Sequence, residues 1–528
     1  MTALAPDIRL VHQLLEHTAR RVPDREVLVT HEPGATRLCY ARLAAAAHRC
    51  ARQLVGLGVT RGDRVAILAH NGVEYAAAYY GALAAGAVAV PLNTAADPAS
   101  LLHYLGDSGA RVLVVGPRLE RLVVQAAPRL GEVAVEAIVM AAGPAMAALG
   151  KAAPLGLRLV AAGDADELPA EPLDLALEPD DVASIIYTSG STGRPRGATL
   201  THGNLVANVR SICAYLELTE DDRVLAVLPF YYVYGKSVLN TAVAVGATVV
   251  VENRFQYPNV ALDTLERERC TGFAGVPSTF AILVNRSNLA ERALTDLRWV
   301  TQAGGGMSPA LTRRLLEILP GKRVFVMYGA TEASARLAYV PPDELPGCVG
   351  AIGRAIPDVE LTVRRPDGAE CAVDEAGELY ARGPNIMRGY WNDPEETARA
   401  LGPHGYRTGD LARRDGDGRL WLVGRLKDML KVGGHRVAAR EIEDAILEHA
   451  DVHEAAVIGV ADELLGDRLV AFVVPRTPGA VDAAGLGRFL KDRLPAYKIP
   501  SRIELRADLP KNPSGKILKQ ALRAEVTE

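Results

Sequence analysis

The chain has 528 residues, of which 49% are hydrophobic and 23% are charged. This length predicts several domain-sized units with large cores, and the composition excludes an intrinsically disordered protein. The formal net charge at pH 7 is only −4, so no excess of basic residues indicates a nucleic acid or an anionic membrane as partner. The six cysteines contain no Cys-x-x-Cys pair, which argues against a disulfide framework or a cysteine zinc site.

The amino-terminal end shows no export signal. It lacks the basic segment followed by an apolar run that a secretory signal needs, and we expect a reducing, cytoplasmic compartment. The longest uncharged stretch, residues 75–96, is long enough to span a membrane but is interrupted by Gly81, Gly86 and Pro91. We therefore expect a helix, a turn and a buried strand there, and no membrane span.

Two segments repeat the order strand, helix, strand. In the first, an apolar strand and turn at residues 63–71 precede a helix at 74–83 and a strand at 87–91. The second occupies residues 223–251, where an aromatic loop follows the first strand and the helix covers 237–245. Continuous apolar strands in such units predict parallel sheets that are covered by helices on both faces.

The later part of the chain changes in character. Residues 141–179 are rich in Ala, Gly and Pro, which indicates surface connections, and from about Val359 short strands alternate with Gly and Asp turns. After Lys427 helices and strands follow one another as in a small α+β domain. The predicted fold class is therefore α/β. A large domain at 1–426 holds two parallel-type αβ subdomains and a small β subdomain, and a small α+β domain follows at 427–528.

The strongest local signal is a loop dense in Gly, Ser and Thr that follows an apolar strand at about residue 185. Glycines let backbone N–H groups approach an anion, while hydroxyl and guanidinium groups add donors for phosphate oxygens. The candidate phosphate-binding residues are Thr188, Ser189, Gly190, Ser191, Thr192, Gly193 and Arg196. The spacing of a Walker motif is absent. A flexible Gly/Ser linker is the alternative, and composition alone leaves the two readings open.

Together with four further motifs, this loop makes the sequence resemble the adenylate-forming superfamily of acyl-CoA synthetases, carrier-loading adenylation domains and beetle luciferases. The motifs occupy residues 188–197, 327–332, 406–411, 424–437 and 510–516. They follow the family's order over nearly the whole chain. The resemblance therefore implies the family's fold, with a C-terminal domain that is mobile, and a use of ATP.

The resemblance assigns the nucleotide to residues of three motifs. It implies that Tyr328 stacks on adenine, that Asp410 accepts the ribose hydroxyls, and that Glu332 holds the Mg²⁺ of ATP. These roles suit an aromatic face and anionic oxygens. Gly329, Thr331 and Arg425 complete the ATP-binding and catalytic set. Without the resemblance, Glu332 would be interpreted as a solvent-exposed surface residue. Asp410 would be interpreted as a turn or helix-cap residue.

The resemblance also implies a catalytic lysine and a hinge. Lys516 corresponds to the lysine that reaches the carboxylate and the α-phosphate during adenylation, an electrostatic role without proton transfer. No general base is needed, because a carboxylic acid with a pKa of about 4 is already ionised at neutral pH. Lys427 lies at the hinge position, and Gly433 and Gly434 line the CoA tunnel. The plainer alternatives are an exposed lysine and a hairpin turn.

Two positions depart from the family pattern. Arg196 stands where relatives commonly have lysine, which keeps the charge but alters the geometry. Tyr232 stands where many relatives have a histidine that gates the path between the acyl pocket and the CoA tunnel. A tyrosine can form an aromatic gate but cannot become cationic in this way.

The acyl pocket is expected around Tyr232, Gly304 and Gly305. Residues 223–262 contain no Asp that would hold an α-ammonium group, so the substrate is predicted to be an apolar carboxylic acid and not an α-amino acid. Lys236 is left with two readings: it pairs with a second carboxylate of the substrate, or it is solvent-exposed.

The sequence thus predicts an ATP-dependent acid-thiol ligase. It would convert the acid to an acyl-AMP with release of pyrophosphate and then pass the acyl group to CoA, with ATP, Mg²⁺ and CoA as cofactor and cosubstrates. Loading of a separate carrier protein is the alternative acceptor reaction, and a luciferase-like oxygenase is a rarer one. A degenerate nucleotide-binding sensor would be expected to lose Glu332 or Lys516, and neither is lost. The sequence does not determine the oligomeric state.

Overall fold

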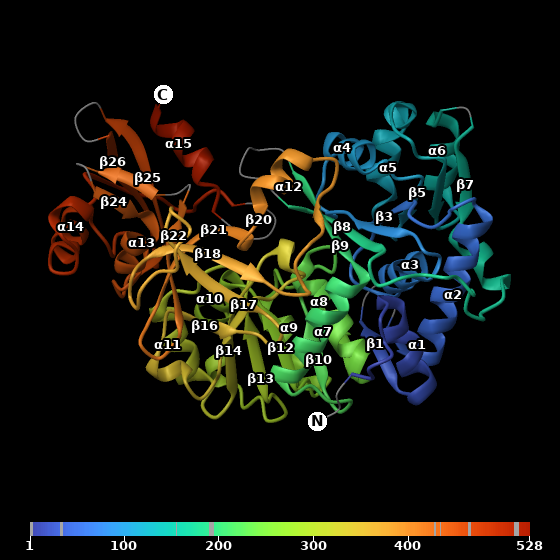
Figure 1. The fold of residues 1–528 in the computed structure, drawn as a ribbon, viewed down its shortest axis with the longest axis horizontal. Coiled ribbons are helices and arrows are strands. Elements are labelled where there is room, and N and C mark those ends of the chain that lie inside the picture. Colours follow the sequence, from blue (N-terminus) through green and yellow to red (C-terminus); the bar gives the residue numbers. More distant parts are fainter. Residues whose placement is uncertain are drawn as a thin grey trace.

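A computed structural model describes residues 4–31, 35–154, 156–188, 195–426, 429–432, 435–462, 466–511 and 517–527. Figure 1 shows two large α/β halves side by side, with the C-terminal unit, in orange and red, at one end of the molecule. This arrangement matches the α/β fold class expected from the sequence.

The first half is built on an eight-stranded sheet in the order β19-β9-β8-β4-β3-β5-β6-β7. The central pairs are parallel, whereas β8, β9 and β19 pair antiparallel with one another. Its strands are β3 (Arg64–Leu68), β4 (Val88–Pro91), β5 (Val112–Val115), β6 (Ala137–Met140), β7 (Arg158–Ala161), β8 (Val182–Thr188), β9 (Arg196–Thr201) and β19 (Gly389–Tyr390). Its helices are α2 (Tyr40–Gly56), α3 (Val73–Ala84), α4 (Pro98–Ser108), α5 (Glu120–Ala126) and α6 (Pro144–Ala152).

The second half is a fourteen-stranded sheet in the order β17-β18-β21-β22-β16-β15-β14-β13-β12-β10-β11-β1-β2, with β20 paired to β21. Its parallel part consists of β1 (Glu26–Thr30), β10 (Arg223–Ala226), β11 (Thr248–Val251), β12 (Gly272–Gly275), β13 (Trp299–Gln302) and β14 (Arg323–Tyr328), and β2 (Thr36–Cys39) closes the edge antiparallel to β1. The associated helices are α1 (Val11–Arg21), α7 (His202–Leu216), α8 (Val233–Val245), α9 (Pro258–Arg267), α10 (Pro277–Arg286) and α11 (Pro309–Ile318).

The β-rich segment, expected from about Val359, begins earlier, at Ala338, and continues this same sheet. Its antiparallel strands are β15 (Ala338–Val340), β16 (Ala351–Ala355), β17 (Glu360–Arg364), β18 (Gly377–Arg382), β20 (Leu401–Gly402), β21 (Gly405–Arg414) and β22 (Leu420–Arg425), with helix α12 (Pro394–Ala400) beside them. β15 pairs with β14, so the β subdomain shares its hydrogen-bonded sheet with the parallel strands. The nucleotide-side motifs at β14 and β21 are therefore held by one continuous sheet.

The C-terminal unit has its own five-stranded sheet, formed by β23 (Met429–Val432), β24 (His435–Ala438), β25 (Val452–Asp462), β26 (Gly466–Pro475) and β27 (Arg502–Leu505). Helices α13 (Ala439–Leu447), α14 (Ala483–Lys491) and α15 (Lys519–Thr527) accompany it, and two separate apolar clusters form its core. Lys427, the expected hinge and domain boundary, lies outside the described residues.

The two strand-helix-strand units occur as predicted, at residues 64–91 and 223–251. One boundary differs: α8 begins at Val233 and not at Ser237, so Tyr234 lies on the helix and Tyr232 is its N-cap. The sequence predicted a loop for these aromatic residues because their intrinsic helix propensity is low. Their burial in the folded protein overrides that weak preference. Tyr234 is buried between α8 and β13, with its hydroxyl 2.9 Å from Thr301 O.

Among the described residues, no helix is long and apolar enough to cross a membrane. Residues 75–96 instead form most of α3, a turn, β4 and a short loop, and residues 75–92 are buried except for Ala77. The six cysteines are free thiols.

Candidate active site

The predicted site residues gather where parallel strands end. Thr188 is the last residue of β8, Tyr328 is the last of β14, and the turn at Gly304 follows β13. In open α/β sheets the crevice beyond the carboxyl ends of the strands is where ligands bind. The fold thus brings motifs from different parts of the chain to one region.

Asp410 connects two other predicted nucleotide-binding residues. Tyr328 Oη donates a 2.6 Å hydrogen bond to Asp410 Oδ2, and Arg425 Nε donates a 2.7 Å bond to Oδ1. Asp410 is only 4% exposed, whereas the Arg425 side chain is 44% exposed. Burial and the neighbouring Asp410 charge raise the pKa of Tyr328 well above its usual value, so Tyr328 remains a donor. The carboxylate is therefore fixed in orientation at the end of β14.

Glu332 is oriented from β19, a strand of the other sheet. Tyr390 Oη donates a 2.8 Å hydrogen bond to Glu332 Oε1, and Met387 N donates to the Glu332 backbone carbonyl. Burial, followed by the Glu332 charge, raises the pKa of Tyr390, so the phenol stays protonated. No described residue donates a hydrogen bond to Glu332 Oε2. One hard anionic oxygen is thus available, and the donor chemistry fits Mg²⁺.

Arg196 is held by Glu396 of α12 and by Asp393, the N-cap of that helix. Its Nη1 lies 2.7 Å from Glu396 Oε1 and its Nε lies 3.8 Å from Asp393 Oδ2. Its guanidinium carbon lies 5.8 Å from the centre of the Tyr390 ring. Thr188 lies opposite Arg196 in the β8–β9 ladder. Arg196 is therefore positioned beside the Glu332–Tyr390 pair, at the base of the Gly- and Ser-rich loop.

The segment that carries Thr331 and Glu332 is a tight, strained turn. A Cβ at Gly329 would overlap with the carbonyl oxygen of Ala335, so only glycine permits the chain to fold back here. Ser334 and Ala335 have φ values of 56° and 120°, which L-residues rarely adopt. Such strain persists where surrounding contacts impose it, and it concentrates at functional sites.

The predicted acyl-side residues lie near α8 and β13. The half-buried Tyr232 ring packs 4.5 Å from that of Tyr231. Gly304, with φ of 83°, and Gly305 form the exposed turn after β13. A Cβ at Gly306 would overlap with the guanidinium group of Arg440 on α13. The C-terminal unit therefore reaches the turn that is expected to border the acyl group.

Lys236 requires a correction. The solvent-exposed reading is wrong, because the side chain is 1% exposed and its Nζ lies 3.0 Å from Ser184 Oγ and 4.8 Å from the centre of the Tyr79 ring. Burial lowers the pKa of Lys236 to about 7. It projects from α8 toward β8 and α3, and no carboxylate of the described residues lies within 4.0 Å of it.

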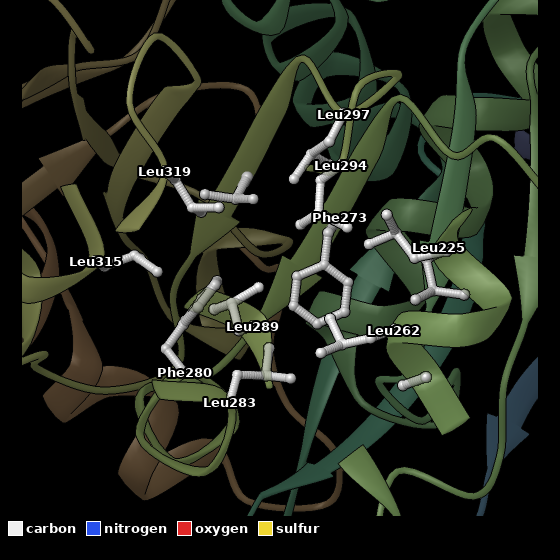
Figure 2. A pocket seen from close by; sticks show the side chains of 13 residues that line it. Leu225, Leu262, Phe273, Phe280, Leu283, Leu289, Leu294, Leu297, Leu315 and Leu319 are labelled. Carbon is white, nitrogen blue, oxygen red and sulfur yellow. The ribbon is translucent and has the colours of Figure 1, made fainter. Parts of the chain in front are cut away.

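The cavity in Figure 2 is a separate feature. It is lined only by apolar side chains behind the parallel sheet, among them Leu225, Phe273 and Phe280. Its volume is about 10 Å³, which is at most enough for one water molecule. It is a packing defect of the core and cannot hold an acyl group.

Several predicted residues lie outside the described ranges and keep the status of predictions: Ser189, Gly190, Ser191, Thr192, Gly193, Lys427, Gly433, Gly434 and Lys516. Sequence reasoning missed Tyr390, Glu396 and Arg336. Tyr390 and Glu396 carried no usable signal, because their partners are distant in the chain. Arg336 did carry one: it is a lone cation in a largely apolar run that follows Glu332.

Two family models match the chain. The model described as AMP-binding enzyme matches residues 15–391, and the model described as AMP-binding enzyme C-terminal domain matches residues 441–516. The first covers well over half of the chain.

Individual relatives match over nearly their whole length. A feruloyl-CoA synthase from Amycolatopsis sp is 35% identical over 493 residues, which cover 93% of this chain and 94% of the relative. An indoleacetate–CoA ligase from Aromatoleum aromaticum is 33% identical over 520 residues, which cover 96% and 94%. The solved structure of the anthranilate CoA ligase AuaEII in complex with anthranoyl-AMP has a TM-score of 0.87 and 25% identity, with 98% of this chain and 97% of that chain covered.

Proposed function

The chain belongs to the family of AMP-binding enzymes, and on that premise we propose that it is an acyl-CoA synthetase that works through an acyl adenylate. The acid would be an apolar carboxylic acid and not an α-amino acid. Relatives named for feruloyl-CoA and indoleacetate, and a similar structure that contains anthranoyl-AMP, support this substrate class.

In the first half-reaction the acid's carboxylate oxygen attacks the α-phosphorus of ATP, and pyrophosphate leaves. Asp410, held by Tyr328 and Arg425, would accept the ribose hydroxyls. Glu332 would hold the Mg²⁺ of ATP, which offsets phosphate charge. Lys516 would stabilise charge that grows on the pentacoordinate phosphorus. No residue has to remove a proton, because the carboxylate is already ionised.

In the second half-reaction the CoA thiol attacks the acyl carbon and AMP leaves. We place Tyr232 at the wall between the acyl group and the thiol path, with Gly433 and Gly434 along that path. A hinge at Lys427, between a large domain at 1–426 and a small domain at 427–528, would exchange Lys516 for the glycine loop. Transfer to a carrier protein is the alternative, and the CoA-ligase names of the relatives favour CoA.

One observation carries the proposal most directly. Tyr328, Asp410 and Arg425 come from β14, β21 and β22, yet they form one hydrogen-bonded set beside the Glu332 turn. The same strand ends would face the nucleotide.

ATP–pyrophosphate exchange with a panel of acids tests the first half-reaction, and acyl-CoA formation with CoA or with a carrier protein tests the second. We expect exchange with aromatic and other apolar acids, and thioester formation with CoA. Lys516→Ala should lose exchange but still transfer the acyl group from a supplied acyl adenylate. Absence of exchange with every acid would contradict the ligase function and favour a nucleotide-binding sensor.

A further inference from the structure

Arg336 is a cation buried on the acyl side of the Glu332 turn. It is 3% exposed, and its guanidinium carbon lies 4.0 Å from the centre of the Tyr234 ring. Its Nε is 3.3 Å from Met327 Sδ, and its Nη1 donates to the Ala335 carbonyl at 3.2 Å. The pKa of the adjacent Tyr215 is raised by burial and lowered in part by the Arg336 charge. Arg336 therefore lies among α7, α8 and β14.

The surroundings do not neutralise this charge. No carboxylate of the described residues lies within 4.0 Å of the Arg336 nitrogens, whereas Arg292, an arginine of low exposure, pairs with Asp263 and Glu266. A guanidinium has five N–H donors, and a thioether sulfur is a weak acceptor. A buried charge without an anionic partner is expensive. The protein thus maintains a costly group that its own residues leave incompletely satisfied.

The backbone of Arg336 is nevertheless held firmly. Asn208 Nδ2 and Asn385 Nδ2 donate to its carbonyl oxygen at 3.2 and 2.8 Å, and Asn385 also donates to Ala333 O. The two residues before Arg336 have positive φ. A strained backbone and two buried side-chain amides therefore fix the position of this residue. Such strain is expected where a group acts on a ligand.

The neighbours of Arg336 border the expected acyl group. The Tyr234 hydroxyl bonds to Thr301 near the end of β13, just before the Gly304 turn that is expected to border the acyl group. The guanidinium carbon lies 4.0 Å from the centre of the Tyr234 ring, and Nε and one N–H of Nη1 are already engaged by Met327 and Ala335, so the end of the guanidinium formed by Nη1 and Nη2 is left for a ligand. An in-plane edge is the geometry that binds a carboxylate through two parallel hydrogen bonds.

We propose that Arg336 is a specificity-determining residue that binds a second carboxylate at the far end of the acid, so that the preferred substrate is a dicarboxylic acid with an apolar middle. This inference rests on the proposed ligase function. It refines the apolar acid expected from the sequence, because the aromatic wall would contact the middle and the guanidinium would contact the end.

The test compares acids in matched pairs, each a dicarboxylic acid and its analogue with a methyl group at the far end. The series runs from succinate to suberate and includes isophthalate and terephthalate. We expect wild type to favour the dicarboxylic member of its best pair by at least about 100-fold in kcat/KM, as sites that hydrogen-bond a substrate group do. Arg336→Leu should reverse that preference, mainly through KM, and Arg336→Lys should retain part of it.

Arg292→Leu is the control, because it removes an arginine of low exposure that pairs with Asp263 and Glu266 far from the turn. It should leave the acid preference unchanged. Equal or better activity of wild type with the methyl-terminated acids would overturn the inference, and this measurement needs no variant. A parallel loss of both pair members in Arg336→Lys and Arg336→Leu, with a lowered Tm, would also overturn it and assign Arg336 a structural role. Failure of every acid would overturn the ligase function itself.

Discussion

The proposed nucleotide side of the site contains paired charges, whereas the proposed acyl side contains buried cations without a carboxylate partner among the described residues. On the nucleotide side Asp410 pairs with Arg425, Arg196 pairs with Glu396, and Glu332 accepts from Tyr390. On the acyl side, Arg336 and Lys236 are more deeply buried than the cations Arg196 and Arg425 of the nucleotide side. Neither has a carboxylate of the described residues within 4.0 Å.

The difference indicates where the substrate would have to supply an anionic group. Partly exposed ion pairs contribute little to stability, about 0–1 kcal/mol, and serve mainly to orient their members. A buried cation without a partner costs much more and must find an anion or lose its proton. Arginine does not lose its proton in proteins, whereas lysine can. The two buried cations should therefore behave differently, and variants on the two sides should fail differently.

The largest expected effect is at Asp410. Asp410→Asn keeps an oxygen for Tyr328 but removes the charge that holds Arg425 and would bind ribose, so kcat/KM for ATP should fall by about 100-fold or more. Exchange kinetics at varied ATP measure this. Asp374→Asn, which removes an exposed carboxylate paired with Arg413, should have no effect. An unchanged KM and kcat for ATP in Asp410→Asn would remove this residue from the nucleotide site.

Lys236 should affect stability, in a pH-dependent way. Its pKa is lowered to about 7 by burial, from 10.5 in the unfolded chain. Below about pH 7 the lysine is charged in the folded and unfolded states, and the folded state bears the full burial cost. Between about pH 7 and 10.5 the folded state binds fewer protons, so the stability of wild type should rise with pH.

Lys236→Met should therefore be more stable than wild type by about 1–4 kcal/mol near pH 7 and should lack that rise. Urea unfolding at several pH values from neutral to mildly alkaline measures both effects. Lys491→Met, at an exposed position on α14, is the control and should leave the pH dependence intact. A Lys236→Met protein that is less stable at every pH would mean that the bond to Ser184 outweighs the burial cost.

Tyr232→Ala should change selectivity more than rate. Without the ring that packs on Tyr231, bulkier aromatic acids should be accepted, with a shift of about tenfold in the kcat/KM ratio of a bulky to a small acid. Competition assays with mixed acids measure this ratio. Tyr257→Ala, at a 62% exposed position, is the matched control. An unaltered acid profile and thiolation rate would mean that Tyr232 is ordinary core.

The smallest effect is expected at Tyr390. Tyr390→Phe removes one hydrogen bond to Glu332, of about 0.5–1.5 kcal/mol, so adenylation should slow by about 2- to 12-fold and need more Mg²⁺. A Mg²⁺ titration of the exchange rate measures the change. Tyr380→Phe, which removes a similar bond to Glu378 on β18, should not alter the Mg²⁺ dependence. Equal Mg²⁺ dependence in the two variants would mean that Tyr390 does not orient a metal ligand.

The sequence by itself determined the fold class, the two strand-helix-strand units and the family, because apolar periodicity and motif spacing are local properties of the chain. Family motifs also pointed to Tyr328, Glu332, Asp410 and Arg425, and the structure joins Tyr328 and Arg425 to Asp410 by hydrogen bonds, with Glu332 in the turn that follows Tyr328. Their functional roles remain predictions that the variants above would test.

Only the tertiary structure decided the partners and the burial of the charged groups. Tyr390 and Glu332 are 58 residues apart in the sequence, and Glu396 and Arg196 are 200 residues apart. No local sequence pattern therefore predicts either pair. Helix α8 lies between the two halves of the molecule and is buried on nearly all sides. A helix without a solvent face has no amphipathic pattern, and for this physical reason the sequence could not reveal that Lys236 is inside.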